Sequence, residues 1–227
     1  MIHEEQLSII PGKSPEVDKW RQSLETMYNQ AFEPEERIPF TLLWRSQFQP
    51  PADDFIPEIA VLVRGGTPAG AAWYGYMPDV NLGYLGYLFV DLTYRGMGLG
   101  SMLFRYVYHA VENIAQRLNH KPPRFTFWEV RIPEEVEAGI EKTRRFQRIR
   151  FYERLGAGIV KVWYPCPPIG EGLPPIDFLP MAITYPPGLL LSTADRTDLV
   201  YYGLVRMCGV DLESEKLARA LASAREE

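Results

Sequence analysis

The fold is decided by residues 84–101, which read Tyr84-Leu-Gly-Tyr-Leu-Phe-Val-Asp-Leu-Thr-Tyr-Arg-Gly-Met-Gly-Leu-Gly-Ser101. The apolar run 84–91 predicts a strand, and the amphipathic run 101–118 predicts a long helix. Between them lie three alternating glycines: Gly96, Gly98 and Gly100. Free backbone N–H groups at a helix start, with the helix dipole behind them, form a socket for phosphate, and Arg95 adds positive charge. The alternative is a connection in which the glycines only permit tight packing, since short glycine motifs have many chance matches.

The composition limits the classes of protein that this chain can belong to. Its 227 residues, 46% of them hydrophobic, suit one large domain or a domain with an appendage. A net charge of −5 argues against nucleic acid as a partner, because binding phosphates requires a basic surface. No run of eighteen apolar residues occurs and the N-terminus lacks the pattern of a signal peptide. We therefore expect a cytoplasmic protein without a membrane partner.

The cysteines and histidines do not indicate a metal site. Cys166 and Cys208 are the only cysteines, and their wide separation is not a metal-ligand spacing. A disulfide between them is possible, although no feature of the sequence supports it. The three histidines do not cluster with cysteines or carboxylates, so we expect no metal.

The segments before the glycine loop predict two helices and an antiparallel meander. Residues 1–15 are expected to form a polar leading arm. Helical spacing of apolar residues predicts helices over 17–32 and 35–49, the second closed by Pro50 and Pro51. Strands are predicted over 58–63, 69–76 and 84–91, the first two paired as a hairpin.

The segments after the loop predict a crossover unit and then a less regular region. A strand over 125–130 follows the helix, so it should run parallel to strand 84–91. The remaining expectations are a charged helix from 134 that ends at a left-handed Gly156, a strand over 159–164, an irregular proline-rich loop over 165–180, a short strand over 181–185, and helices over 199–207, with an N-cap at Ser192, and 212–225.

Two common phosphate-binding patterns do not match the loop. The P-loop of nucleotide triphosphatases requires Lys followed by Ser or Thr, whereas Leu99-Gly100-Ser101 contains no lysine. The dinucleotide fingerprint requires a third glycine where this chain has Ser101, and it follows the first strand of a parallel sheet rather than a meander.

The pattern Arg95-x-x-Gly98-x-Gly100 after Phe89 and Val90 resembles the acetyl-CoA loop of the GNAT superfamily of N-acetyltransferases, R/Q-x-x-G-x-G/A. Phe151-Tyr152-Glu-Arg-Leu-Gly156 resembles the second signature of the same family. The resemblance covers most of the chain. It implies a mixed α/β fold in which the meander joins a parallel strand-helix-strand unit. We expect a GNAT-like domain over 1–187 and a C-terminal helical extension over 188–227 packed on it.

The resemblance also implies a site. The pyrophosphate of acetyl-CoA, the co-substrate, would bind at Arg95, Gly96, Met97, Gly98, Leu99, Gly100 and Ser101. The pantetheine arm would lie beside Phe89 and Val90, and a backbone N–H near Val90 would stabilise the thioester oxygen. A primary amine would attack the thioester directly. Glu129, or less favourably Glu58, is the candidate base, and Tyr152 is the candidate acid.

The chain departs from the family pattern on the side of the acceptor. Arg145 and Arg148 stand where the second signature often has Asn and Ala, and Ala157 replaces the usual Phe. Arg144, Arg145, Arg148 and Arg150 either meet the phosphates of CoA or form a solvated helix face. The alternatives are a non-catalytic acyl-CoA sensor and a transferase of a longer acyl group. The acceptor is expected to be a small-molecule or peptide amine, and residues 188–227 could cover its groove or build a homodimer interface.

Overall fold

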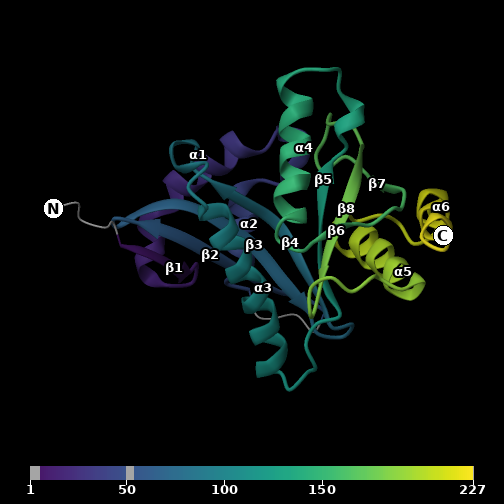
Figure 1. The fold of residues 1–227 in the computed structure, drawn as a ribbon, viewed down its shortest axis with the longest axis horizontal. Coiled ribbons are helices and arrows are strands. Elements are labelled where there is room, and N and C mark those ends of the chain that lie inside the picture. The colour runs from purple at the N-terminus through teal and green to yellow at the C-terminus, as the bar shows by residue number, and fades with distance from the viewer. Residues whose placement is uncertain (1–5, 50–53, 227) are drawn as a thin grey trace. The chain divides into compact units, whose positions relative to one another are not determined.

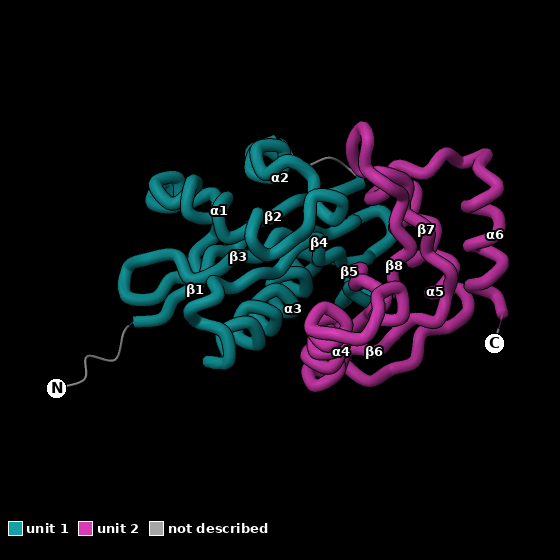
Figure 2. The backbone as a smooth tube through the Cα atoms, turned by 90° about the horizontal axis from the view of Figure 1, so that it is seen from above, with its two compact units in different colours: residues 1–126 teal, residues 127–227 magenta. Residues whose placement is uncertain are grey.

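The computed structural model describes residues 6–49 and 54–226, which fall into two compact units, unit 1 over 1–126 and unit 2 over 127–227 (Figures 1 and 2). Strand β5, Phe125–Arg131, crosses the boundary between them. Helices and strands alternate along the chain, so the predicted mixed α/β class is confirmed. The predicted division at residue 187 stays a prediction, as does the parallel pairing of strands 84–91 and 125–130.

Unit 1 is built on four antiparallel strands in the order β1, β2, β3 and β4. Their bounds are Leu7–Pro11, Ile56–Arg64, Thr67–Met77 and Leu82–Val90. The predicted meander is thus confirmed. The expected leading arm is wrong for Leu7–Pro11, which pairs with β2 and half-buries Ile9 and Ile10. A five-residue edge strand with only two partly buried side chains shows too little alternation to be recognised.

Helices cover both faces of these strands. The 3-10 helices η1 (Pro15–Trp20) and η2 (Pro34–Glu36) accompany α1 (Arg21–Ala31) and α2 (Phe40–Ser46) on one face, and α3 (Leu99–Arg117) lies on the other (Figure 2). Successive strand side chains point to opposite faces. Ile59, Val61 and Val63 therefore join a core with Leu24 and Tyr28 of α1.

The early helices are shorter than predicted. α1 follows a 3-10 turn, and α2 begins only after Pro39, its N-cap residue. A proline favours the first positions of a helix but disfavours helix in the residue before it, so Pro34 and Pro39 break the segment into short pieces. The predicted stop at Pro50 and Pro51 lies outside the described residues.

Unit 2 combines short strands with helices. Its strands are the greater part of β5, followed in the sheet by β8 (Ile176–Thr184) and then β6 (Gly158–Ile159). Strand β7 (Tyr164–Cys166) also pairs with β8. The helical segments are η4 (Pro133–Glu135), α4 (Ile140–Glu153), α5 (Thr193–Tyr202), the π-helix η5 (Gly203–Met207) and α6 (Glu215–Ser223). Ser192 caps α5 through a reciprocal bond with Asp195, and Gly156 has φ 92° after α4, as predicted.

The expected irregular loop over 165–180 is wrong at both of its ends. Pro165 and Cys166 belong to β7, where they pair with Asp177 and Ile176 of β8. Proline is tolerated in a strand where its missing N–H is not needed for the ladder, as on an edge strand. The high proline content of residues 165–180 therefore does not prevent strands from forming at the two ends of this segment. The single strand predicted over 159–164 is divided between β6 and β7.

A disulfide joins Cys166 of β7 to Cys208, which follows η5. The two residues are 42 positions apart. A crosslink over such a loop lowers the entropy of the unfolded chain and stabilises the folded state by about 4 kcal/mol.

We expect a reductant to lower the midpoint of thermal unfolding by several degrees, because the unfolded chain regains this entropy. Calorimetry with and without dithiothreitol measures the shift. A variant with both Cys166→Ser and Cys208→Ser should show the lower midpoint and no response to reductant. An unchanged wild-type midpoint would contradict the expected contribution.

Candidate functional site

The glycine loop of unit 1 has the backbone that a phosphate socket requires. Gly96 has φ 81° and Gly98, the N-cap residue of α3, has φ 78°. Side-chain residues rarely adopt this left-handed conformation. A Cβ at either position would have no atom within 4 Å, so glycine is required here by backbone conformation and not by crowding.

The start of α3 presents unsatisfied amides. The carbonyl of Gly98 accepts the first helical bond, from Met102 N at 3.1 Å. The amides of Leu99, Gly100 and Ser101 precede it and have no partner within the helix. Residues 95–98 are exposed. The seven predicted binding residues, 95–101, thus form one continuous segment that fits a phosphate group.

Arg64, at the end of β2, holds the loop in place and was not predicted. Its guanidinium donates to the sulfur of Met97 at 2.9 Å and lies 5.0 Å from the centre of the Tyr94 ring. Arg64 lies about thirty positions before the loop, and its sequence surroundings do not indicate a contact with the loop.

A second contact that fixes the loop is local in sequence. The Asp91 carboxylate accepts hydrogen bonds from Thr93 N at 2.8 Å and from Thr93 Oγ1 at 2.6 Å. These hydrogen bonds lower the pKa of Asp91.

The backbone of β4 directs the amide of Val90 away from β3. Gly70 lies opposite Val90 in the antiparallel register, and Asp91 N donates to Ala69 O at 2.9 Å. In such a ladder this bond makes Gly70 and Val90 a non-hydrogen-bonded pair, whose N–H groups point outward. The Val90 amide is therefore not used by β3, as a donor to a bound oxygen requires.

In unit 2, Glu129 is held by a residue that the sequence did not indicate. The hydroxyl of Tyr164, a fully buried residue of β7, donates to Glu129 Oε1 at 2.7 Å. A Cβ at Gly203 would lie 2.0 Å from that hydroxyl. Gly203 of η5 therefore leaves the space that the tyrosine occupies, and the segment after residue 188 contributes to the surroundings of Glu129.

Tyr152 lies on α4, 6% exposed, with its ring 4.7 Å from that of Trp128. Burial raises the pKa of Tyr152 to about 12. The hydroxyl is therefore protonated at neutral pH, as a general acid must be. The loop belongs to unit 1, whereas Glu129 and Tyr152 belong to unit 2, so their approach to one ligand stays a prediction.

The structure also places two of the four arginines of α4 and the alternative base Glu58. Arg145 is buried and structural: it donates to Ile132 O at 2.8 Å and pairs with Glu141 at 3.2 Å and Glu135 at 3.5 Å. Arg144 is exposed on α4. Glu58 lies in unit 1, 3.6 Å from Lys13.

Residues 18–123 match the model of the Acetyltransferase (GNAT) family. This stretch, just under half of the chain, is similar to a GNAT acetyltransferase domain. The matched residues include the whole glycine loop, and the match to an acetyltransferase family supports an acyltransferase. No curated protein matches this sequence.

Solved structures share the GNAT fold over most of the chain. A GNAT-family protein from Bacteroides thetaiotaomicron has a TM-score of 0.61 at 19% identity and covers 91% of this chain and 99% of its own. The ribosomal-protein-S18-alanine N-acetyltransferase from Escherichia coli has a TM-score of 0.50 at 18% identity, covering 82% and 99%. A Salmonella typhimurium structure that contains acetyl-CoA has a TM-score of 0.52 at 12% identity, covering 82% and 98%.

None of the helices within residues 6–49 and 54–226 combines the length and apolarity needed to cross a membrane. Within the same residues, no group of three or more His, Cys, Asp or Glu side chains is placed to hold a metal ion.

Proposed function

We propose that this chain transfers the acetyl group of acetyl-CoA to a primary amine by direct attack. The observation that carries this proposal is the pair of left-handed glycines, Gly96 and Gly98, at the amino end of α3. They leave the amides of the first helical turn open to a pyrophosphate. Acetyl-CoA supplies the activated acyl group as a thioester. Residues 95–101 hold the pyrophosphate, and the Val90 amide donates to the thioester oxygen as negative charge develops.

Glu129 and Tyr152 perform the two proton transfers. An alkyl amine has a pKa of about 10.4, so it arrives as an ammonium and must lose a proton to Glu129 before attack. The hydroxyl of Tyr164 donates a hydrogen bond to Glu129 Oε1, and this bond favours the ionised carboxylate and fixes its orientation. The departing thiolate, with a pKa of about 8.5, takes a proton from Tyr152.

Tyr164→Phe is expected to move the acid limb of the kcat/KM profile to higher pH, by up to about one pH unit, because the carboxylate loses a donated hydrogen bond. Activity on the alkaline side should fall less than about threefold. Steady-state kinetics from pH 5 to 10 measure both. Tyr201→Phe on α5 is the matched control and should leave the profile unchanged. A uniform loss at every pH would show that Tyr164 supports packing only.

Tyr152→Phe is expected to lower kcat about a hundredfold, because the thiolate then leaves unprotonated. The KM for acetyl-CoA should change little. Because burial raises the pKa of Tyr152 to about 12, deprotonation of this residue should not lower wild-type activity below about pH 11. Stopped-time detection of free thiol measures kcat. Turnover equal to that of the wild type would exclude Tyr152 as the acid.

The proposed function is tested by CoA release with a panel of amines. Cationic amines are favoured by the net charge of −5. The panel should also contain a peptide beginning with alanine, because the E. coli neighbour is named for such an acceptor. Amine-dependent release supports the transferase. Binding of acetyl-CoA without release would indicate a sensor, and tighter binding of longer acyl-CoA would indicate another acyl group. Cytoplasmic location and the homodimer remain part of the proposal, to be tested by fractionation and light scattering.

A further inference from the structure

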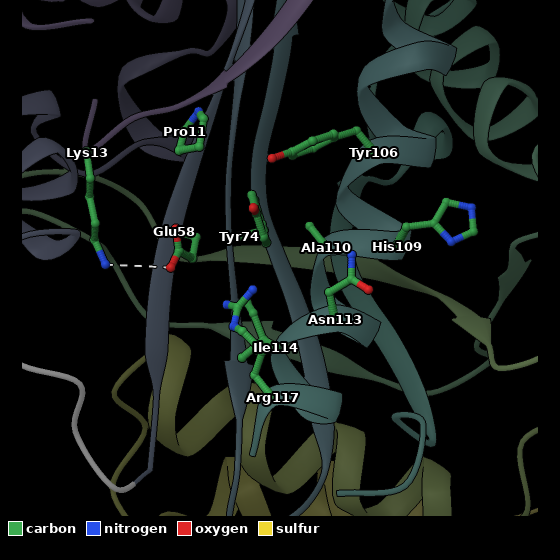
Figure 3. A pocket seen from close by; sticks show the side chains of 10 residues that line it. All are labelled: Pro11, Lys13, Glu58, Tyr74, Tyr106, His109, Ala110, Asn113, Ile114 and Arg117. Carbon is green, nitrogen blue, oxygen red and sulfur yellow. Dashed lines mark ion pairs between the residues drawn. The ribbon is translucent and has the colours of Figure 1, made fainter. Parts of the chain in front are cut away.

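A hollow lies in unit 1, on the face of the strands that α3 covers (Figure 3). Its volume is about 390 Å³, within the range of small-molecule sites. Its floor is formed by Glu58 of β2 and Tyr74 of β3, which are direct partners in the antiparallel register. Its wall is one side of α3 from Tyr106 to Arg117. At a rise of 1.5 Å per residue, this wall begins about 12 Å and ends about 28 Å from the glycine loop, so the hollow is separate from the pyrophosphate socket.

The donors on the helix wall are not used by the protein itself. Within the described residues, the side chains of Arg117 and Asn113 form no hydrogen bond or ion pair. Figure 3 shows the guanidinium of Arg117 extending from α3 toward Glu58. Tyr74 is buried, and burial is the main cause of its raised pKa; Tyr106 of α3 also lines the hollow.

The opposite side of the hollow carries the Glu58 carboxylate, whose ion pair with Lys13 a bound ammonium can replace. Glu58 and Lys13 are 3.6 Å apart, with side chains 20% and 42% exposed. Ion pairs of this kind contribute little, so an ammonium with better geometry can replace Lys13. The hollow therefore offers one acceptor of positive charge and, across from it, the cation Arg117 with the amide of Asn113.

We infer that this hollow binds a small zwitterion, a free α-amino acid, with its ammonium at Glu58 and its carboxylate at Arg117 and Asn113. A purely anionic ligand would leave Glu58 facing negative charge, and a purely cationic ligand would face Arg117. An amino acid satisfies both ends, and the volume leaves room for its side chain. Charge-assisted hydrogen bonds at each end supply the affinity.

Calorimetric titration of the full chain with each common L-amino acid, in saturating CoA, tests the inference. At least one amino acid should bind with a Kd below 1 mM. Its methyl ester and its N-acetyl derivative should each bind at least about tenfold more weakly, because each lacks one charge. If no amino acid binds, or if inorganic phosphate binds as well as the amino acid, the inference is wrong.

Substitutions locate the binding. Arg117→Gln should weaken it about tenfold or more without changing the KM for acetyl-CoA, and Glu58→Gln should weaken it to a similar degree. Asn113→Ala, at an exposed position of α3, is a second variant that should also weaken it. Arg105→Gln is the matched control, since Arg105 is an exposed arginine of the same helix outside the hollow. Binding that survives the changes at Arg117, Glu58 and Asn113 would place the amino acid elsewhere, for example at the acceptor site.

Discussion

Gly98→Ala is expected to raise the KM for acetyl-CoA about tenfold or more while changing kcat less. Gly98 is the N-cap of α3 and has φ 78°. An L residue in the left-handed region costs about 1–2 kcal/mol, so the variant either keeps the conformation at that cost or relaxes and turns the amides of the first helical turn away from the pyrophosphate. A relaxed loop loses affinity for a ligand that the amides bind together.

The chain provides a matched control for backbone strain. Gly66, in the turn between β2 and β3, has the same φ of 78° and likewise no atom within 4 Å of a Cβ. Gly66→Ala should lower the free energy of unfolding about as much as Gly98→Ala but leave the KM unchanged. Initial-rate kinetics and urea unfolding of both variants provide the comparison. Equal KM values in the two variants would mean that the loop does not bind the co-substrate.

The parts of the fold that could be predicted are those whose signal is local. An apolar strand, alternating glycines and an amphipathic helix lie next to one another in sequence, so residues 84–118 predict the glycine loop and the long helix α3 after it. The capping box at Ser192 and the left-handed Gly156 also depend on neighbouring residues. Each of these features is fixed by turn chemistry or by helical period, which the sequence displays directly.

The parts that could not be predicted depend on contacts between distant residues. Tyr164 is 35 positions from Glu129, and the glycine that makes room for its hydroxyl is 39 positions further on at Gly203. Neither residue lies in a motif. Arg64 likewise reaches the loop only because β2 ends beside it. Only Tyr164 of β7 fell within a predicted strand, because proline is compatible with a strand mainly at an edge, and the sequence does not show that Pro165 lies in such a strand.

Glu129→Gln is expected to lower kcat/KM at neutral pH by a factor of about 10²–10⁴, the usual contribution of general-base catalysis. Glutamine keeps an oxygen that can accept from Tyr164, so the side chain should stay in place. It cannot take a proton from an ammonium. The variant should therefore act only on amine that is already deprotonated in solution, and the free fraction of an amine with a pKa of about 10.4 rises tenfold per pH unit. Its kcat/KM should rise with unit slope up to about pH 10, whereas the wild type should level off earlier.

A carboxylate of the same unit separates catalysis from packing. Asp177 of β8 accepts from Trp163 Nε1 at 2.9 Å, and Asp177→Asn preserves that acceptor as Glu129→Gln does. The control should keep wild-type kcat/KM within about twofold and a wild-type pH profile. If Glu129→Gln also retains more than about a third of the activity with an unchanged profile, another group is the base. The unit slope of log kcat/KM against pH decides between the two explanations. A variant that is merely destabilised loses activity at every pH, and its profile does not follow the deprotonation of the amine substrate.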